Sequence, residues 1–225
     1  MSDGGSALLL CSEAGLLASS LRSSDAVELL STSTCTSSLY AEPQDLTRLT
    51  TCASAVRSAY SEAKVSAAHV DVAEVHDCFT ITELMMYEAL QLCSPGSAAA
   101  MLRAHETDLN GRTPVNTGGG LVGFGHPVGA TGVKQVVELW RQMKGNCGAY
   151  QMKKIPQIGV CANMGGEFEC SWLLPTMFLF IIDIAHHHAS SQAMIARQWY
   201  LYCVTACELP LKYSFTSLVK NGNKN

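Results

Sequence analysis

The chain has 225 residues, of which 48% are hydrophobic and 15% charged, and its formal net charge is −4. This length allows one large or two small domains, and the apolar fraction is ample for a packed core. Lys and Arg are dispersed along the chain, so the composition argues against a nucleic-acid surface.

The ten cysteines are scattered, and no two of them form a Cys-x-x-Cys pair. Neither a zinc site nor a thioredoxin-like redox motif is therefore indicated. The residues after Met1 lack the basic n-region of a secretory signal peptide. We interpret the cysteines as reduced, intracellular thiols, most of them small core residues.

The first forty residues predict short elements. Residues 6–12 form an apolar run that favours a buried strand, and Glu13 to about Ser20 favours a short helix. Residues 26–30 predict another strand. Residues 31–38 are nearly all Ser, Thr and Cys, a composition that favours a loop.

A longer helix is expected from Pro43 to about Lys64, because apolar or small residues recur there every three or four positions. Residues 72–75 then predict a strand that delivers His76-Asp-Cys-Phe79 at its carboxyl end. The next helix is expected over about residues 82–92. Ligands bind at the carboxyl ends of strands in α/β sheets, so His76 and Cys78 occupy a position suited to chemistry. The strand alone leaves open that Cys78 is a core residue and that His76 caps the strand.

A glycine-rich loop at residues 118–132 holds seven glycines in fifteen residues. Such a loop lets the backbone adopt positive φ and come close to a ligand. His126 is the only titratable side chain between Arg112 and Lys134. The helix expected after it, ending at Gly145, would favour a neutral imidazole at its N-terminus. A solvated histidine in a tight turn remains the alternative.

A third loop is expected at residues 162–166. Residues 158–161 predict an apolar strand, residues 162–166 a turn, and residues 168–174 the returning strand of a hairpin.

The three loops occur in the order His76-Asp-Cys-Phe79, then Gly125-His-Pro-Val-Gly-Ala-Thr-Gly132, then Asn163-Met-Gly-Gly166. Together they resemble the C-terminal half of a thiolase. The form of the first loop resembles the sterol carrier protein type, and residues 75–93 match that branch nearly end to end. The resemblance runs from about Asp3 to Leu174.

This resemblance implies an α/β fold, a mixed sheet covered by helices, as one of the two similar domains of a thiolase subunit. Residues 1–20 would be the end of the N-terminal domain and the connection out of it. Residues 21–174 would be the C-terminal domain. Residues 175–225 would be a divergent tail of unknown structure, in which a helix packing on the other domain or a sequence without designed function are both open.

The resemblance also implies roles for individual residues. His126 matches the histidine that activates the nucleophilic cysteine and polarises the thioester carbonyl. His76 stands where many thiolases hold a water with an asparagine, and Cys78 matches an acid/base of the sterol-carrier branch. Asn163 and Gly165 belong to the loop that lines the second oxyanion hole.

Two departures from the family pattern matter. The family's nucleophilic cysteine lies in the N-terminal domain, and no cysteine here stands in a matching context. Many thiolases read Cys-x-Gly in the last loop, but here Cys161 is displaced by one place, which favours Cys78 as the acid/base and a structural role for Cys161.

The resemblance further implies acyl-CoA as ligand, coenzyme A as substrate, and no tightly bound cofactor. It implies a homodimer or pairing with a full-length thiolase, in a peroxisome or mitochondrion, with a role in fatty-acid or sterol metabolism. The final residues are not a Ser-Lys-Leu signal. The apolar run from Met177 to Ala185 is too short to span a bilayer. His186, His187 and His188 are adjacent and would point in different directions, so we predict no metal site.

Three interpretations follow. The first is a thiolase-like acyltransferase polypeptide that is inactive alone because it lacks the nucleophile. The second is a non-catalytic module that binds acyl-CoA or lipid, or that pairs with a thiolase. The third is a truncated product that exposes a broad apolar face and folds poorly.

Overall fold

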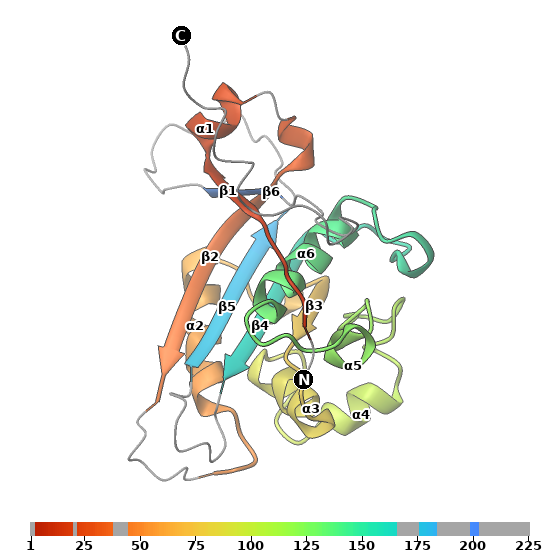
Figure 1. Ribbon diagram of the computed structural model, residues 1–225. Helices are drawn as coiled ribbons and strands as arrows, with labels where there is room; N and C mark the ends of the chain where they lie inside the picture. Colours follow the sequence, from red (N-terminus) through yellow and green to blue (C-terminus); the bar gives the residue numbers. More distant parts are fainter. Residues whose placement is uncertain (1–2, 20–21, 38–44, 166–175, 184–198, 203–225) are drawn as a thin grey trace.

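A six-stranded mixed sheet forms the centre of the molecule (Figure 1). The computed structural model describes residues 3–19, 22–37, 45–165, 176–183 and 199–202. The strand order is β1-β6-β2-β5-β4-β3, in which β3 and β4 are parallel and the other neighbours are antiparallel. The predicted α/β class with a mixed sheet is confirmed.

The strands are β1 (Leu9–Ser12), β2 (Val27–Thr36), β3 (Val72–Val75), β4 (Ile158–Gly165), β5 (Thr176–Asp183) and β6 (Trp199–Tyr202). The helices are α1 (Glu13–Ala18), α2 (Thr50–Ala63), α3 (Thr80–Ala89), α4 (Ala98–Arg103), α5 (Gly120–Phe124) and α6 (Thr131–Met143). Short 3₁₀ turns cover Ser23–Asp25, Ala67–His69 and Gly148–Tyr150.

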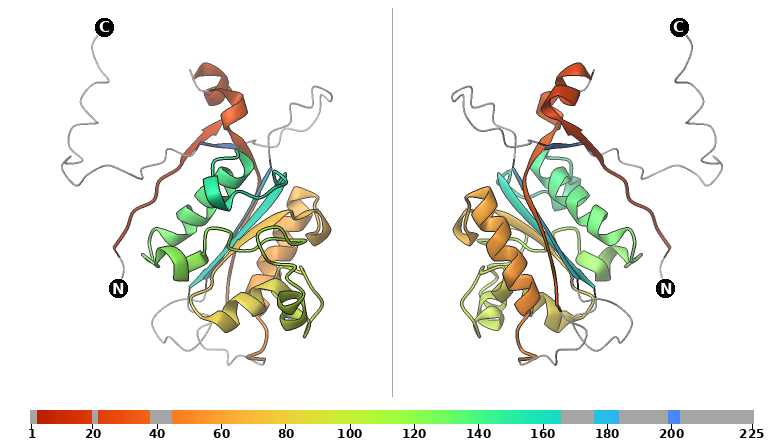
Figure 2. Two further views of the ribbon diagram at one scale, coloured as in Figure 1. Left: turned by 90° about the vertical axis from the view of Figure 1, so that its right-hand side faces the viewer. Right: turned by 90° about the vertical axis from the view of Figure 1, so that its left-hand side faces the viewer.

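Helices α2 and α6 cover opposite faces of the sheet (Figure 2). Successive residues of a strand point to opposite faces, and β3 follows this rule. Ala73 and Val75 join the core cluster that contains α2 and α3, whereas Val72 joins the cluster that contains α6. Two apolar clusters therefore anchor helices on both sides of the same short strand.

The parallel pairing of β3 and β4 positions the candidate site. Val75 lies opposite Ala162, and the His76 N–H donates to the Ala162 carbonyl at 3.0 Å. Parallel strands end at the same edge of a sheet, so residues that follow Val75 meet residues that follow Ala162. The expectation that His76 leaves the carboxyl end of a strand is confirmed.

Two expectations for the first forty residues are wrong. Strand β1 is not buried. Among the described strands it lies at the edge of the sheet beside β6, and Leu9 and Leu10 are 47% and 49% exposed. Residues 31–36 are not a loop but the second half of β2, paired with β5. From Thr32 to Thr36 exposed and half-buried side chains alternate, and Thr is favoured on such a pleated, half-buried surface.

Other boundaries also differ from the prediction. Helix α2 begins at Thr50 because Asp45 accepts the Thr47 N–H at 2.9 Å and closes a turn before it. It ends where Lys64 adopts φ 55°. Helix α3 begins and ends earlier than residues 82–92, and α4 was not predicted.

The region after residue 161 differs from the expected hairpin. Residues 162–165 continue β4 rather than forming a turn, and the antiparallel partner is β5. The returning strand predicted at residues 168–174 lies outside the described residues. Within the tail, residues 176–183 and 199–202 are strands and not a helix; the boundary at residue 174 itself stays a prediction.

Candidate functional site

His76 is buried at the end of β3, with 4% of its surface exposed. Its Nδ1 lies 2.7 Å from Oδ1 of Asn163 on β4. Burial lowers the pKa of His76, and the nearby His126 lowers it further, while the bond to Asn163 and the charge of Asp77 oppose the shift. The imidazole is therefore mainly neutral at physiological pH.

His126 lies in the glycine-rich loop between α5 and α6 and is half-buried. Its Nδ1 lies 2.7 Å from Oγ1 of Thr131, the first residue of α6. The expected position before a helix N-terminus is confirmed, and the helix holds the ring through Thr131. Val128 beside it is 79% exposed, so the loop keeps one side open.

The structure brings the two histidines together. Their ring centroids are 4.9 Å apart and their planes make an angle of 79°, an edge-to-face contact. The rings come from loops fifty residues apart in the chain. Two imidazoles in contact can exchange or share a proton with one bound group, so this contact is the geometric centre of the candidate site.

Asp77 ties the two histidine loops together. Its Oδ1 accepts the Leu121 N–H at 2.9 Å, and the side chain is 6% exposed. Gly120 has φ 59°, and a β-carbon there would overlap Asp77 Oδ2 and lie 2.8 Å from its Cγ. Only glycine leaves room for this carboxylate. Sequence reasoning missed this contact, because no spacing rule joins residues 77 and 120.

Cys78 follows directly and is exposed, at the start of the loop into α3. Partial desolvation of its thiol raises its pKa, and hydrogen bonds from the Phe79 backbone and the Thr82 side chain oppose the shift. The group is thus mainly a thiol at neutral pH. Throughout residues 45–165, no hydrogen bond joins a cysteine to either imidazole.

The residues from β4 separate into different environments. Asn163 is half-buried against His76, whereas Gly165 is exposed at the end of the strand. Cys161 is fully buried, and burial raises its pKa far above the usual range. Cys161 faces Gln135 of α6, with 3.9 Å between Sγ and Oε1.

The other described cysteines mostly contact the core. Cys52 and Cys147 are buried, and Cys11, Cys35 and Cys93 are half-buried against the apolar clusters. None of the seven described cysteines forms a disulfide bond.

A pair of buried carboxylates lies between β3 and α6. Glu74 is 1% exposed, and burial and the Glu138 charge raise its pKa to about 8. Neither Glu74 oxygen has a hydrogen bond of good geometry within the described part of the chain. The Thr117 N–H comes close enough to stabilise the ionised carboxylate and so opposes the rise in its pKa. Glu138 instead pairs with Lys134 at 2.7 Å and accepts the Tyr150 hydroxyl at 3.0 Å. The sequence offers one sign of this pair, because Glu74 is an acidic residue within the otherwise apolar strand 72–75.

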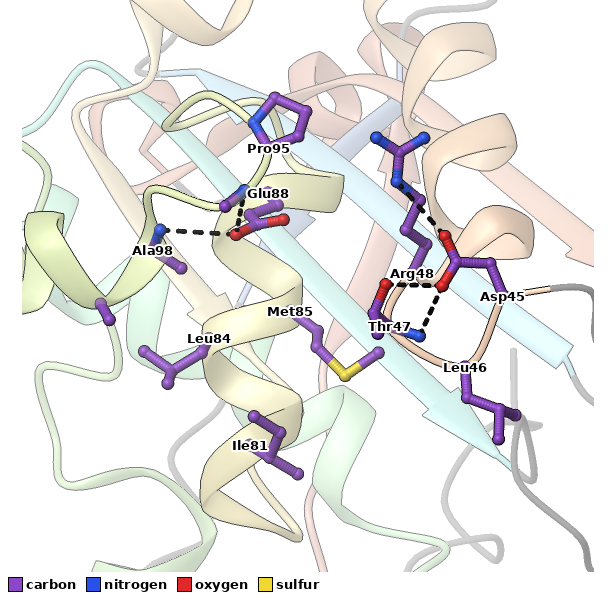
Figure 3. A pocket seen from close by; sticks show the side chains of 12 residues that line it. Asp45, Leu46, Thr47, Arg48, Ile81, Leu84, Met85, Glu88, Pro95 and Ala98 are labelled. Atoms are coloured by element: carbon purple, nitrogen blue, oxygen red, sulfur yellow. Dashed lines mark hydrogen bonds and ion pairs between the residues drawn. The ribbon is translucent and has the colours of Figure 1, made fainter.

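A pocket lies away from the two histidines, between α3, α4 and the segment before α2 (Figure 3). Its volume is about 600 Å³, and Met85 points from α3 toward Thr47. Arg48 is paired with Asp45, and Glu88 accepts the N–H groups of residues 96 and 98. Because its charged groups are already paired, the histidine pair is the better candidate for chemistry.

Within the described ranges, no helix is long and apolar enough to cross a bilayer. No group of three or more His, Cys, Asp or Glu side chains there is arranged to hold a metal ion. Residues 186–188 lie outside these ranges.

Much of this chain matches known proteins in sequence and in fold. Residues 32–174, more than half of the chain, match the family model described as thiolase C-terminal domain-like. A solved structure of an Ltp2-ChsH2(DUF35) aldolase superposes with a TM-score of 0.58 over 69% of this chain and 39% of that chain. At 16% identity this superposition shows the fold alone.

Three curated relatives are informative. The chain is 29% identical over 166 residues to the benzoylsuccinyl-CoA thiolase subunit BbsB of Thauera aromatica. It is 37% identical over 123 residues to an acetyl-CoA acetyltransferase of Methanothermobacter thermautotrophicus, and 41% over 98 residues to sterol carrier protein 2 of Rattus norvegicus. These matches cover 74%, 55% and 44% of this chain but only 43%, 32% and 18% of the relatives.

The matched region contains both histidine loops and the β3–β4 edge that positions them. The chain therefore belongs to the thiolase C-terminal domain-like family and is a domain of the thiolase and sterol carrier protein 2 type.

Proposed function

We propose that this chain supplies the acid/base half of a thiolase-like acyltransferase site, which handles the thioester of an acyl-CoA. The edge-to-face contact of His76 and His126 supports this proposal most directly. The two rings belong to different loops and meet where β3 and β4 end, the position at which α/β sheets bind ligands.

His126 is the proposed base. In cleavage of a 3-ketoacyl-CoA, it takes the proton of an attacking thiol, and the thiolate adds to the 3-keto carbon. The resulting oxyanion collapses, the bond between the second and third acyl carbons breaks, and an acyl thioester and an enolate form. The proton taken from the thiol makes the His126 imidazole cationic, and this cation stabilises the developing oxyanion.

Cys78 is the proposed acid that returns a proton to the enolate carbon. Its raised pKa keeps the proton on sulfur at neutral pH, as a proton donor requires and a nucleophile does not. General acid catalysis of this kind is worth about 10²–10⁴ in rate. Asn163 and Gly165 are proposed to line the oxyanion loop, and coenzyme A is the proposed co-substrate.

The nucleophilic thiol is proposed to come from outside the described residues, in a partner thiolase or another part of the protein. The purified chain is then inactive alone. The test is thiolysis of acetoacetyl-CoA by the chain, by His126→Gln and by His105→Gln, an exposed histidine after α4 that serves as the matched control. Turnover by the chain that is lost only in His126→Gln would refute inactivity and confirm the role of His126. A separate mass-spectrometric test is acylation of a thiol by acyl-CoA.

A second candidate function is a non-catalytic module that binds acyl-CoA or pairs with a full-length thiolase. Exposed apolar side chains on the histidine loops favour it: Phe79 is 70% exposed, Val122 82% and Val128 79%. Size-exclusion chromatography of the chain with a full-length thiolase tests pairing. Binding of acyl-CoA without acylation or turnover would favour this module over the enzyme. A peroxisomal or mitochondrial location and a role in lipid metabolism remain part of the proposal, testable by cell fractionation.

A further inference from the structure

Each histidine of the pair is held through the same ring atom. Nδ1 of His76 contacts Asn163 and Nδ1 of His126 contacts Thr131, both at 2.7 Å. A neutral imidazole has one N–H and one lone pair, and the partner of one nitrogen decides which form is present. The two contacts therefore determine what each Nε2 can do.

The partner of His76 is an acceptor only. Oδ1 of an asparagine amide has lone pairs but no proton, so the 2.7 Å contact requires that His76 Nδ1 carries the hydrogen. Asn163 stands on β4 directly beside the end of β3, because the strands are parallel and His76 bonds to Ala162. The pairing of the strands thus fixes the pairing of the side chains.

The partner of His126 is a hydroxyl with a single proton. Thr131 Oγ1 lies 3.2 Å from the Pro127 carbonyl, toward which the backbone N–H groups of residues 130 and 131 also point. If the hydroxyl donates to Pro127, it can also accept from His126 Nδ1–H, and two hydrogen bonds form. If it donates to Nδ1, only one forms. Thr131 is 1% exposed, so water cannot readily replace the lost bond.

We propose that Asn163 and Thr131 are positioning residues that hold neutral His76 and His126 in the Nδ1–H form and leave both Nε2 atoms as acceptors. Sequence reasoning placed Asn163 in the oxyanion loop and gave Thr131 no role. Two Nε2 acceptors fit a ligand group that donates a hydrogen bond, such as an S–H or O–H group. They disfavour a carbonyl as the first ligand, because a carbonyl oxygen only accepts hydrogen bonds.

The consequence for reactivity rests on the proposed function. A thiol gives its proton to Nε2 of one imidazole, whose Nδ1–H is already bound to an acceptor. The resulting cation therefore keeps one hydrogen bond to the protein and directs its new N–H at the substrate oxygen. The protein then needs no ring flip between taking the thiol proton and stabilising the oxyanion.

The test uses the whole chain without any acyl-CoA. Long-range ¹H–¹⁵N spectra of histidine rings distinguish the two neutral tautomers, and they would be recorded at about pH 8, where an ordinary imidazole is neutral. Thr131→Val and Asn163→Leu remove the acceptor, whereas Thr131→Ser and Asn163→Asp retain one. His69 and His105, both exposed, are internal references.

We expect the Nδ1–H form to predominate at His76 and His126 in the unaltered chain. Thr131→Val should shift the tautomer ratio of His126 toward Nε2–H by about two- to twelvefold, the range that one hydrogen bond confers, and Asn163→Leu should do the same for His76. Thr131→Ser and Asn163→Asp, which retain an acceptor, should keep the tautomer ratio of the unaltered chain. An Nε2–H form at either ring of the unaltered chain overturns the assignment for that ring, even if a variant fails to fold. Since no ligand is used, this outcome is independent of whether the chain handles acyl-CoA.

Discussion

Replacing Gly120 by alanine should break the link between the two histidine loops. The added β-carbon would overlap the Asp77 carboxylate, which accepts the Leu121 N–H at 2.9 Å. Gly120 also has φ 59°. Gly148 provides a matched control, because its φ is 56° but no atom of the described residues lies within 4 Å of the position a β-carbon would take there. The two substitutions share the backbone cost and differ in the overlap.

The magnitudes follow from these two terms. A left-handed backbone costs a non-glycine residue about 1–2 kcal/mol, which is the whole expected loss for Gly148→Ala. Overpacking adds about 1–3 kcal/mol, so Gly120→Ala should lower the free energy of unfolding by about 2–5 kcal/mol. Chemical denaturation followed by circular dichroism measures both values. Equal losses for the two variants would refute the idea that Asp77 occupies the space above Gly120.

Three further predictions concern titration and reactivity. The pKa of Glu74 is raised in the folded state to about 8 from 4.5, so stability is lost as the pH rises from about 4.5 to 8. Glu74→Gln should flatten the plot of unfolding free energy against pH between these two values. An unchanged slope would contradict the placement of an ionisable carboxyl in the core at Glu74. His126→Gln should raise the pKa of His76, measured by NMR titration, because His126 contributes to its lowering; a fall would mean that the rings are not in contact. Thiol labelling followed by peptide mapping should modify Cys78 well before Cys161, since one is exposed and the other buried; comparable rates in the folded chain would count against this placement.

The sequence predicts the strand that carries His76 because the apolar run 72–75 is short and the loop signals after it are strong. It predicts α6 because valines, Trp140 and Met143 share one helical face. The apolar spacing does not predict that a second face of α6, which carries polar side chains, is also buried. Gln135, Glu138 and Gln142 are each at most 1% exposed, and each has a partner in another segment. Tyr150 bonds to Glu138 and Gln142, and the Cys161 thiol lies 3.9 Å from Gln135 Oε1.

Two of the errors have a common physical cause. Residues 31–36 form a strand because β5 pairs with them, and the extra length of β4 has the same partner. Long-range pairing overrides local composition. The site shows the same limit: the resemblance singled out His76, Cys78 and His126, but the contacts made by Asp77 and Thr131 depend on which loops the sheet brings together.

The most direct test of the central claim is a titration of the ¹⁵N-labelled chain with coenzyme A, followed through its histidine ring signals. If His76 and His126 form one thiol-handling site, their signals should shift together and saturate with a single dissociation constant, while those of His69 and His105 remain unchanged. Saturable binding that leaves both site histidines unmoved, or that moves only one of them, would contradict the account.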